Sequence, residues 1–140
     1  MQVQVQPYLF FEGKCEEAIE FYRKALDAKV DVVMRYKEAP PSPGMKMPPD
    51  KVRHAAFKVG ETQVLASDGN CSGKPSFQGI SLTVSARDDA HAKSVFNALA
   101  EGGKVTQPLT KTFFSSAFGM LNDKFGVGWM VVGPQEERHG

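Results

Sequence analysis

Cysteine is scarce in this chain, and long apolar runs are absent. Among 140 residues only Cys15 and Cys71 are cysteines, and neither stands in a CxxC or Cys/His spacing. Two such thiols do not make a disulfide framework. No apolar run approaches the roughly 20 residues that a membrane helix needs, and residues 1–6 contain neither the basic nor the apolar segment of a signal peptide. We expect a cytoplasmic protein with no membrane partner.

An excess of charge of one sign is also lacking. The formal net charge is +1, and no block of like charges occurs. A protein that binds nucleic acid through phosphate contacts needs a basic excess on one face, so we expect no nucleic-acid partner. The apolar fraction of 41% and the charged fraction of 24% are those of a soluble globular protein.

The first half of the sequence predicts a strand, a helix and three more strands. Residues 2–11 alternate between a more apolar and a more polar set of side chains. This period of two predicts a strand with one drier and one wetter face. After Gly13, apolar residues recur at helical spacing, with acidic side chains early and basic ones late, as the helix dipole favours. The prolines of residues 38–50 indicate a surface loop. The helical apolar positions are Ala18, Ile19, Tyr22, Ala25 and Leu26, and the later strands are 29–37, 52–59 and 61–67.

The second half repeats this order. Asp88 or Asp89 is a suitable N-cap for a helix, and Gly102 with Gly103 is a suitable stop. Residues 134–140 form an expected polar tail. The strands predicted here are 79–85, a short strand around Val105, 113–121 and 127–132.

The repeated order strand–helix–strand–strand–strand predicts the architecture. We expect an α+β fold in which one domain, 1–140, consists of two tandem βαβββ modules, about 2–68 and 78–133. The modules are expected to form a cupped mixed sheet with the helices on its outer face. Neither module alone can bury both its helix and the far face of its sheet, so a shared core or cleft is expected.

Three ordered groups of residues resemble a known family. The segments Pro7–Phe11 and Cys15–Tyr22 are similar to the opening of PhnB-like proteins of the vicinal-oxygen-chelate superfamily. Further similar segments are Asp50–Ala55, Ala66–Gly69, Phe118–Met120 and Asp123–Trp129, so that the resemblance runs from about Gln6 to Val132. It implies the glyoxalase/bleomycin-resistance fold, a small-molecule cleft and a homodimer. Members are often labelled 3-demethylubiquinone 3-methyltransferase, but this sequence has no glycine-rich strand–loop–helix for a methyl donor.

The resemblance also implies where a metal would bind. Metal enzymes of the superfamily take ligands from the first and last strands of each module, where a divalent ion acts as a Lewis acid. Those positions here are Gln6 to Tyr8, Val64, Gly79 or Ser81, and Met130. Val64 and Met130 cannot bind a hard divalent ion, and the neighbours Leu65, Trp129 and Val131 are no better. We therefore expect no metal and no cofactor.

Two functions follow from this interpretation. The favoured one is metal-independent binding or sequestration of a small molecule in a pocket lined by Gln6, Tyr8, Phe10, Ser81, Trp129 and Met130. The aromatic residues of this set are equally typical of a core between two sheets. The alternative is a metal-dependent lyase, isomerase or dioxygenase, which requires an unusual site made by His54 with side chains such as Gln6 or Glu61.

Several single residues have two interpretations each. His54 is a candidate general acid or base, but a strand histidine bonded to a neighbour is the more common case. Arg35 and Arg53 either anchor an anion or face solvent. Cys15 lies where a helix N-terminus lowers a thiol pKa, yet has no evident base partner, so packing is favoured. Asp68 and Asp123 are expected to stabilise turns.

Overall fold

The computed structural model describes residues 3–38 and 47–134. The chain divides into two compact units, Met1–Pro75 and Ser76–Gly140. Most of the predicted proline-rich loop (residues 39–46) and nearly all of the predicted tail (residues 135–140) lie outside the described residues.

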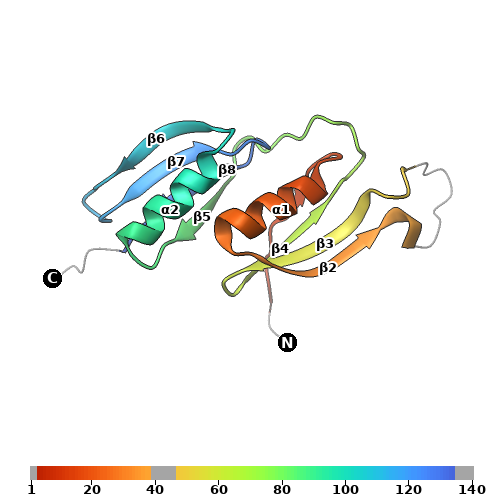
Figure 1. Ribbon diagram of the computed structural model, residues 1–140, viewed down its shortest axis with the longest axis horizontal. Helices are drawn as coiled ribbons and strands as arrows, with labels where there is room; N and C mark the ends of the chain where they lie inside the picture. The colour runs from red at the N-terminus through yellow and green to blue at the C-terminus, as the bar shows by residue number, and fades with distance from the viewer. Residues whose placement is uncertain (1–2, 39–46, 135–140) are drawn as a thin grey trace. The chain divides into compact units, whose positions relative to one another are not determined.

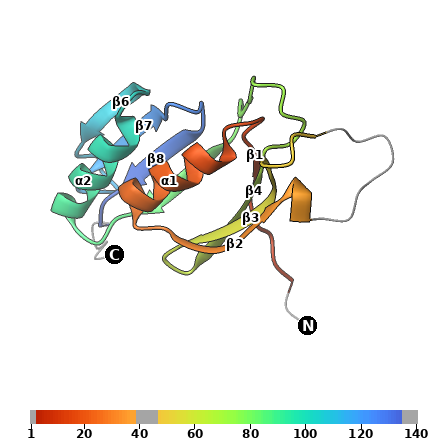
Figure 2. The same ribbon diagram turned by 45° about the vertical axis from the view of Figure 1, so that its right-hand side comes forward.

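The N-terminal unit contains one four-stranded mixed sheet and one helix. The strands lie in the order β1-β4-β3-β2, with β1 parallel to β4 and the other neighbours antiparallel. Helix α1 crosses one face of this sheet, in front of β3 and β4 in Figure 1 and again beside the sheet in Figure 2. The elements are β1 (Tyr8–Phe10), α1 (Cys15–Leu26), β2 (Lys29–Arg35), a 3-10 turn (Tyr36–Glu38), β3 (Val52–Val59) and β4 (Thr62–Ser67).

The C-terminal unit has the same topology. Its strand order is β5-β8-β7-β6, again with the first strand parallel to the last, and α2 covers one face of the sheet (Figure 1). The elements are β5 (Ser81–Ser85), α2 (Asp89–Ala100), β6 (Lys104–Thr110), β7 (Phe118–Asn122) and β8 (Gly128–Val132). The predicted βαβββ repeat and the α+β class are thus confirmed.

Helix α1 covers the sheet face that contains the row Leu9, Ala66 and Ala55, which are paired across β1, β4 and β3. All three residues are buried. The helix contributes its predicted apolar stripe, and the ring of Tyr22, fully buried, stacks on Phe57 at a centroid distance of 5.9 Å. Burial of such rings supplies most of the apolar area that stabilises a small unit.

Helix α2 approaches its sheet closely at Gly119 of β7. A Cβ there would lie 2.5 Å from Cε2 of Phe96, so only glycine leaves room for this ring. The helix begins as predicted: the carboxylate of Asp88 accepts a hydrogen bond from the backbone N–H of His91 at 2.7 Å, which is N-cap geometry.

Several predicted strand boundaries are wrong. The first strand was expected over 2–11 but covers only Tyr8–Phe10, because the ladder with β4 begins at Tyr8. Val3 and Val5, before this ladder, are more than nine-tenths exposed. The strand expected over 113–121 begins only at Phe118. The strand around Val105 extends to Thr110 through Pro108, which an edge strand tolerates.

The late start of β7 has a local cause. The hydroxyl of Thr112 accepts hydrogen bonds from the backbone N–H groups of Phe114 and Ser115, and the hydroxyl of Ser115 donates to the carbonyls of Ala117 and Gly133. Side-chain bonds of this kind compete with a sheet ladder, so the segment forms a turn despite its β-prone composition. In the described part of the chain, no helix has the length and apolar character needed to cross a membrane.

Candidate functional site

The face of the N-terminal sheet opposite α1 is the candidate site. Alternate residues of each strand project from it, and we call this set the open face. Apolar side chains remain exposed there: 52% of Phe10, 45% of Val32, 38% of Met34 and 37% of Tyr8 are accessible. The register places on the open face Tyr8, Phe10, Lys29, Val32, Met34, His54, Ala56, Lys58, Gln63, Leu65 and Ser67.

Tyr8, Phe10 and His54 form an aromatic cluster on the open face. The rings of Tyr8 and Phe10 stack at a centroid distance of 4.8 Å and an interplanar angle of 27°. The Tyr8 hydroxyl lies 2.9 Å from Nδ1 of His54, within hydrogen-bond distance. Residues from β1 and β3 meet here, although 46 positions separate them in the sequence. His54 thus has a hydrogen-bonded neighbour within the sheet, and this partner is a tyrosine of the predicted pocket.

Tyr36 follows β2, and its hydroxyl donates to the carbonyl of Gly69 at 2.8 Å. Burial raises the pKa of Tyr8 above its ordinary value, while a side-chain hydrogen bond with Ser67 and the positive charge of Arg53 oppose the shift. Burial likewise raises the pKa of Tyr36, and the same serine and arginine again act in the opposite direction. Tyr36 was predicted within a strand over 29–37, but β2 ends at Arg35 and Tyr36 begins a 3-10 turn.

The other predicted pocket residues are distributed over both units. Gln6 lies at the far end of the open face, where its amide nitrogen donates to Oε1 of Gln63 at 2.8 Å. Met130 is half-buried, and its sulfur accepts a hydrogen bond from the hydroxyl of Thr83 at 3.9 Å. Ser81 lines a pocket of about 330 Å³ at the start of β5. Trp129 is only 4% exposed, on the α2 side of its sheet beside Leu121, and so occupies the core position given as its alternative.

The residues at the superfamily's metal positions do not fit a hard divalent ion. Val64 was assigned to one such position, but it is buried on the α1 side; the residue paired with Tyr8 on the open face is Leu65. The equivalent pair in the second unit is Thr83 with Met130. Hydrocarbon and thioether groups are poor ligands for such ions. Within residues 3–38 and 47–134, no group of three or more His, Cys, Asp or Glu side chains is arranged to hold a metal.

The alternative ligand set also fails to converge. Glu61 lies in the turn between β3 and β4, and His54 lies five residues from the end of β3, so about 16 Å of strand separates them. Gln6 is bonded to Gln63, four residues along β4 from Ser67, which lies level with His54. His54, Gln6 and Glu61 therefore cannot bind one ion together.

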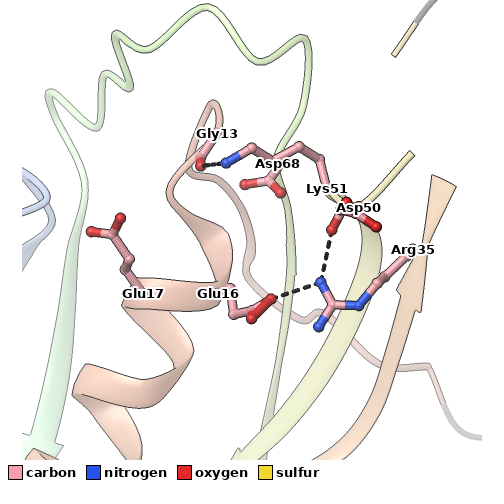
Figure 3. A pocket seen from close by; sticks show the side chains of 7 residues that line it. All are labelled: Gly13, Glu16, Glu17, Arg35, Asp50, Lys51 and Asp68. Atoms are coloured by element: carbon pink, nitrogen blue, oxygen red, sulfur yellow. Dashed lines mark hydrogen bonds and ion pairs between the residues drawn. The ribbon is translucent and has the colours of Figure 1, made fainter. Parts of the chain in front are cut away.

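A pocket of about 460 Å³ lies in the N-terminal unit at the start of α1 (Figure 3). Its charged groups bind one another: Arg35 forms an ion pair with Glu16 at 2.7 Å and donates to the carbonyl of Asp50 at 2.8 Å. Lys51 donates to the carbonyl of Gly13 at 2.8 Å, and Glu17 points away from this network. The guanidinium of Arg35 is therefore already bound by groups of the protein, in contrast to both of its predicted roles. The network of which it is part joins α1 to β2.

The remaining candidates have structural roles. Asp68 is 1% exposed and accepts from two backbone N–H groups, and Asp123 accepts from the backbone of Phe125 and Val127 and from the indole of Trp129. Cys15 is fully buried, and burial together with the nearby Asp68 raises its thiol pKa. This is the opposite of the shift that a reactive thiol requires.

Comparison with known proteins gives close relatives over nearly the whole chain. A protein of Escherichia coli K12, YjdN, is 32% identical over 136 residues, 91% of this chain and 92% of its own. A crystal structure of PA1353 from Pseudomonas aeruginosa is 36% identical with a TM-score of 0.83, over 96% of this chain and 100% of that one. A PhnB protein from Bacillus cereus is 30% identical with a TM-score of 0.79, over 94% and 100%.

More distant structures share the fold alone. They include a glyoxylase/bleomycin resistance protein/dioxygenase domain from Frankia (TM-score 0.66, 16% identity, over 99% of this chain and 96% of that one). The fosfomycin resistance protein FosX from Mesorhizobium loti also matches (TM-score 0.64, 10% identity, over 94% and 91%). The sequence model of the family described as 3-demethylubiquinone-9 3-methyltransferase matches residues 3–132. The chain therefore belongs to this PhnB-like family.

Proposed function

We propose that this protein binds a small organic molecule on the open face of its N-terminal sheet, without a metal, and acts by binding or sequestering it. The observation that carries the proposal is the cluster of Tyr8, Phe10 and His54. Two stacked rings remain accessible beside a hydrogen-bonded imidazole, so that apolar contact area and an orienting polar group occur together. Small-molecule sites in proteins combine these two elements.

Metal-independent action is supported by the chemistry of the open face. Leu65 pairs with Tyr8 on the open face, and Met130 pairs with Thr83 in the second unit, near the strand ends where the family resemblance places metal ligands. Their hydrocarbon and thioether groups are poor ligands for hard divalent ions. Elemental analysis of the purified protein, before and after incubation with Zn²⁺, Mn²⁺, Ni²⁺ and Fe²⁺, tests this part. Stoichiometric metal together with a raised melting temperature would favour the metal-dependent lyase, isomerase or dioxygenase instead.

The binding site is tested by a ligand screen followed by calorimetry on matched variants. Phe10→Ala removes half of the stacked pair, and Phe113→Ala removes an exposed ring, 80% accessible, in the other unit. Loss of one stacking ring costs a ligand about 1 kcal/mol or more, about fivefold in Kd or more. We expect this loss with Phe10→Ala and none with Phe113→Ala. A ligand whose affinity is unchanged in Phe10→Ala binds elsewhere and contradicts the proposal.

We also propose a homodimer, which the family resemblance implies. Support comes from β2, an edge strand on which Val30, Val32, Val33 and Met34 are each at least 36% exposed. Exposed apolar edge strands are usually covered by another chain or element. Light scattering measures the mass of the protein in solution. A mass of twice 15.3 kDa supports the dimer, and a mass of 15.3 kDa contradicts it.

A further inference from the structure

We propose that the C-terminal unit has a binding site of its own, at the start of β5, for a small uncharged molecule that carries several hydroxyl groups on a ring, such as a pyranose sugar. The site is the pocket of about 330 Å³ that Ser81 helps to line, and the described residues around it all belong to this unit. It is independent of the function proposed for the open face, because the two sites share no residue.

The size and the lining of the pocket restrict the ligand. Ligand pockets in proteins are commonly about 300–1,000 Å³, so this volume suits a small molecule. Of the residues that line the pocket in the described part of the chain, none is charged. A pocket of this kind offers no partner to an ionised group, whose loss of hydration would then be uncompensated. These two properties favour a small neutral ligand.

Three oxygen atoms converge beside Gly128 of β8. This residue is paired with Ser81 of β5 on one side and with Asn122 of β7 on the other, so the three residues form a row across the sheet. A Cβ at the central position would lie 2.8 Å from Oγ of Ser81, 3.1 Å from the carbonyl oxygen of Ile80 and 3.4 Å from Oδ1 of Asn122. Because glycine has no side chain, these oxygens can lie this close to one another.

The polar groups of the pocket match hydroxyl groups of a ligand. Ser81 and Asn122 are exposed, and within residues 3–38 and 47–134 neither side chain makes a hydrogen bond. Gln78 adds a second carboxamide to the lining. A serine hydroxyl and a carboxamide can each donate and accept, as the hydroxyl groups of a ligand also do. Several neighbouring hydroxyls on one molecule can therefore bind these side chains together.

Phe77 and Ile80 supply the apolar part of the same pocket. Phe77 is half-buried, and Ile80 is 68% exposed. Aromatic and branched aliphatic side chains pack against the C–H groups of a ring, while a few polar groups fix its orientation. A pyranose carries both C–H groups and several hydroxyls and has no charge, so it meets each of these requirements.

NMR titration of the ¹⁵N-labelled full chain tests the site, with the methyl β-D-pyranosides of glucose, galactose and mannose added in turn. We expect at least one sugar to shift the amide signals of Ser81, Asn122 and Gly128 and to saturate at millimolar concentration. Its fully O-methylated derivative keeps the ring but has no hydroxyl donor, and should cause no saturable shift. The corresponding uronate glycoside carries a carboxylate and should bind more weakly. A derivative that binds as tightly as the parent sugar contradicts the proposed ligand class.

Two serine substitutions on one strand locate the ligand. Ser81→Ala should weaken binding of the sugar about two- to tenfold, the effect of one neutral hydrogen bond. Ser85→Ala removes the same hydroxyl four residues along β5, on the same face of the sheet, and should leave the affinity unchanged. Both serines are exposed, so neither substitution should unfold the unit. If none of the three sugars shifts these signals, or if both variants weaken binding equally, the proposed site is wrong.

Discussion

The carboxylate of Asp68 caps helix α1 by accepting a hydrogen bond from the backbone N–H of Cys15 at 2.7 Å, 53 residues away in the sequence. Its second oxygen accepts from the backbone N–H of Val52 at 2.6 Å. The residue at the N-cap position itself, Lys14, makes no side-chain capping bond. One buried carboxylate therefore satisfies a helix start and a strand start together, and ties α1, β3 and the end of β4 to each other.

Asp68→Asn should destabilise the protein strongly. An amide retains one acceptor oxygen and brings an NH₂ donor against a backbone N–H, which leaves buried donors unsatisfied at a cost of about 2–4 kcal/mol. Urea unfolding followed by circular dichroism measures the change. Asp50→Asn is the control, because this side chain is 83% exposed and its ion pair with Lys37 contributes about 0.5 kcal/mol or less. Equal effects of the two substitutions would refute the capping role.

Asp123→Ala should destabilise the C-terminal unit by about 2–4 kcal/mol, because three donors lose their acceptor. These donors are the backbone N–H groups of Phe125 and Val127 and the indole of Trp129, at 2.8, 3.1 and 2.9 Å. Trp129 is the single tryptophan, so its fluorescence reports directly on this site. An unfolding midpoint in urea unchanged from that of the native sequence would be incompatible with this role. Glu101→Gln, at an exposed position in the same unit, is expected to leave the midpoint within about 0.5 kcal/mol.

Stability should fall at alkaline pH because of Cys15. Burial, with help from Asp68, raises the pKa of this thiol in the folded protein, so above the ordinary thiol pKa of about 8.5 the unfolded chain loses a proton that the folded chain keeps. The stabilisation is complete below that pH and declines as pH rises further. Chemical unfolding at pH 7 to 10 measures it. Cys15→Ala should show a shallower alkaline decline, and an identical slope would argue against this origin.

Thiol labelling should separate the two cysteines. Cys15 is fully buried, whereas Cys71 is partly exposed, and burial raises the pKa of both thiols. We expect the folded protein to react with Ellman's reagent at Cys71 alone, slowly at pH 7 and faster at higher pH. In Cys71→Ser the folded protein should be inert until denaturant is added. Rapid labelling of folded Cys71→Ser would show that Cys15 is accessible.

Tyr8→Phe should change the imidazole of His54 without unfolding the protein. The variant keeps the ring that stacks on Phe10 and loses the hydroxyl 2.9 Å from Nδ1. An exposed hydrogen bond of this kind contributes about 0.5–1.5 kcal/mol. The ¹⁵N shifts of the imidazole at alkaline pH should indicate a proton fixed on Nε2 in the native protein and a mixture of tautomers in the variant. The same tautomer distribution in both would mean that Tyr8 does not position His54.

The local sequence pattern predicted which helices and strands form better than it predicted where they begin and end. Helix α1 follows from its apolar spacing and charge order, and α2 from its Asp88 cap, because these signals lie within a few residues of one another. The prediction of a strand over 113–121 was wrong for its first half. Composition does not reveal that the hydroxyls of Thr112 and Ser115 form hydrogen bonds with the backbone. The alternation of residues 2–6 likewise predicts a strand, but these residues form no ladder with β4, and alternation alone does not specify backbone pairing.

The sequence by itself determined the repeated βαβββ order and the family. Tertiary structure alone decided which residues share a site. Parallel pairing of β1 with β4 and antiparallel pairing of β3 with β4 bring Tyr8 to His54 and place Leu65, rather than Val64, on the open face. Because side chains alternate with a period of two, a register offset of one residue exchanges the faces, and register is fixed by long-range packing and not by any local signal.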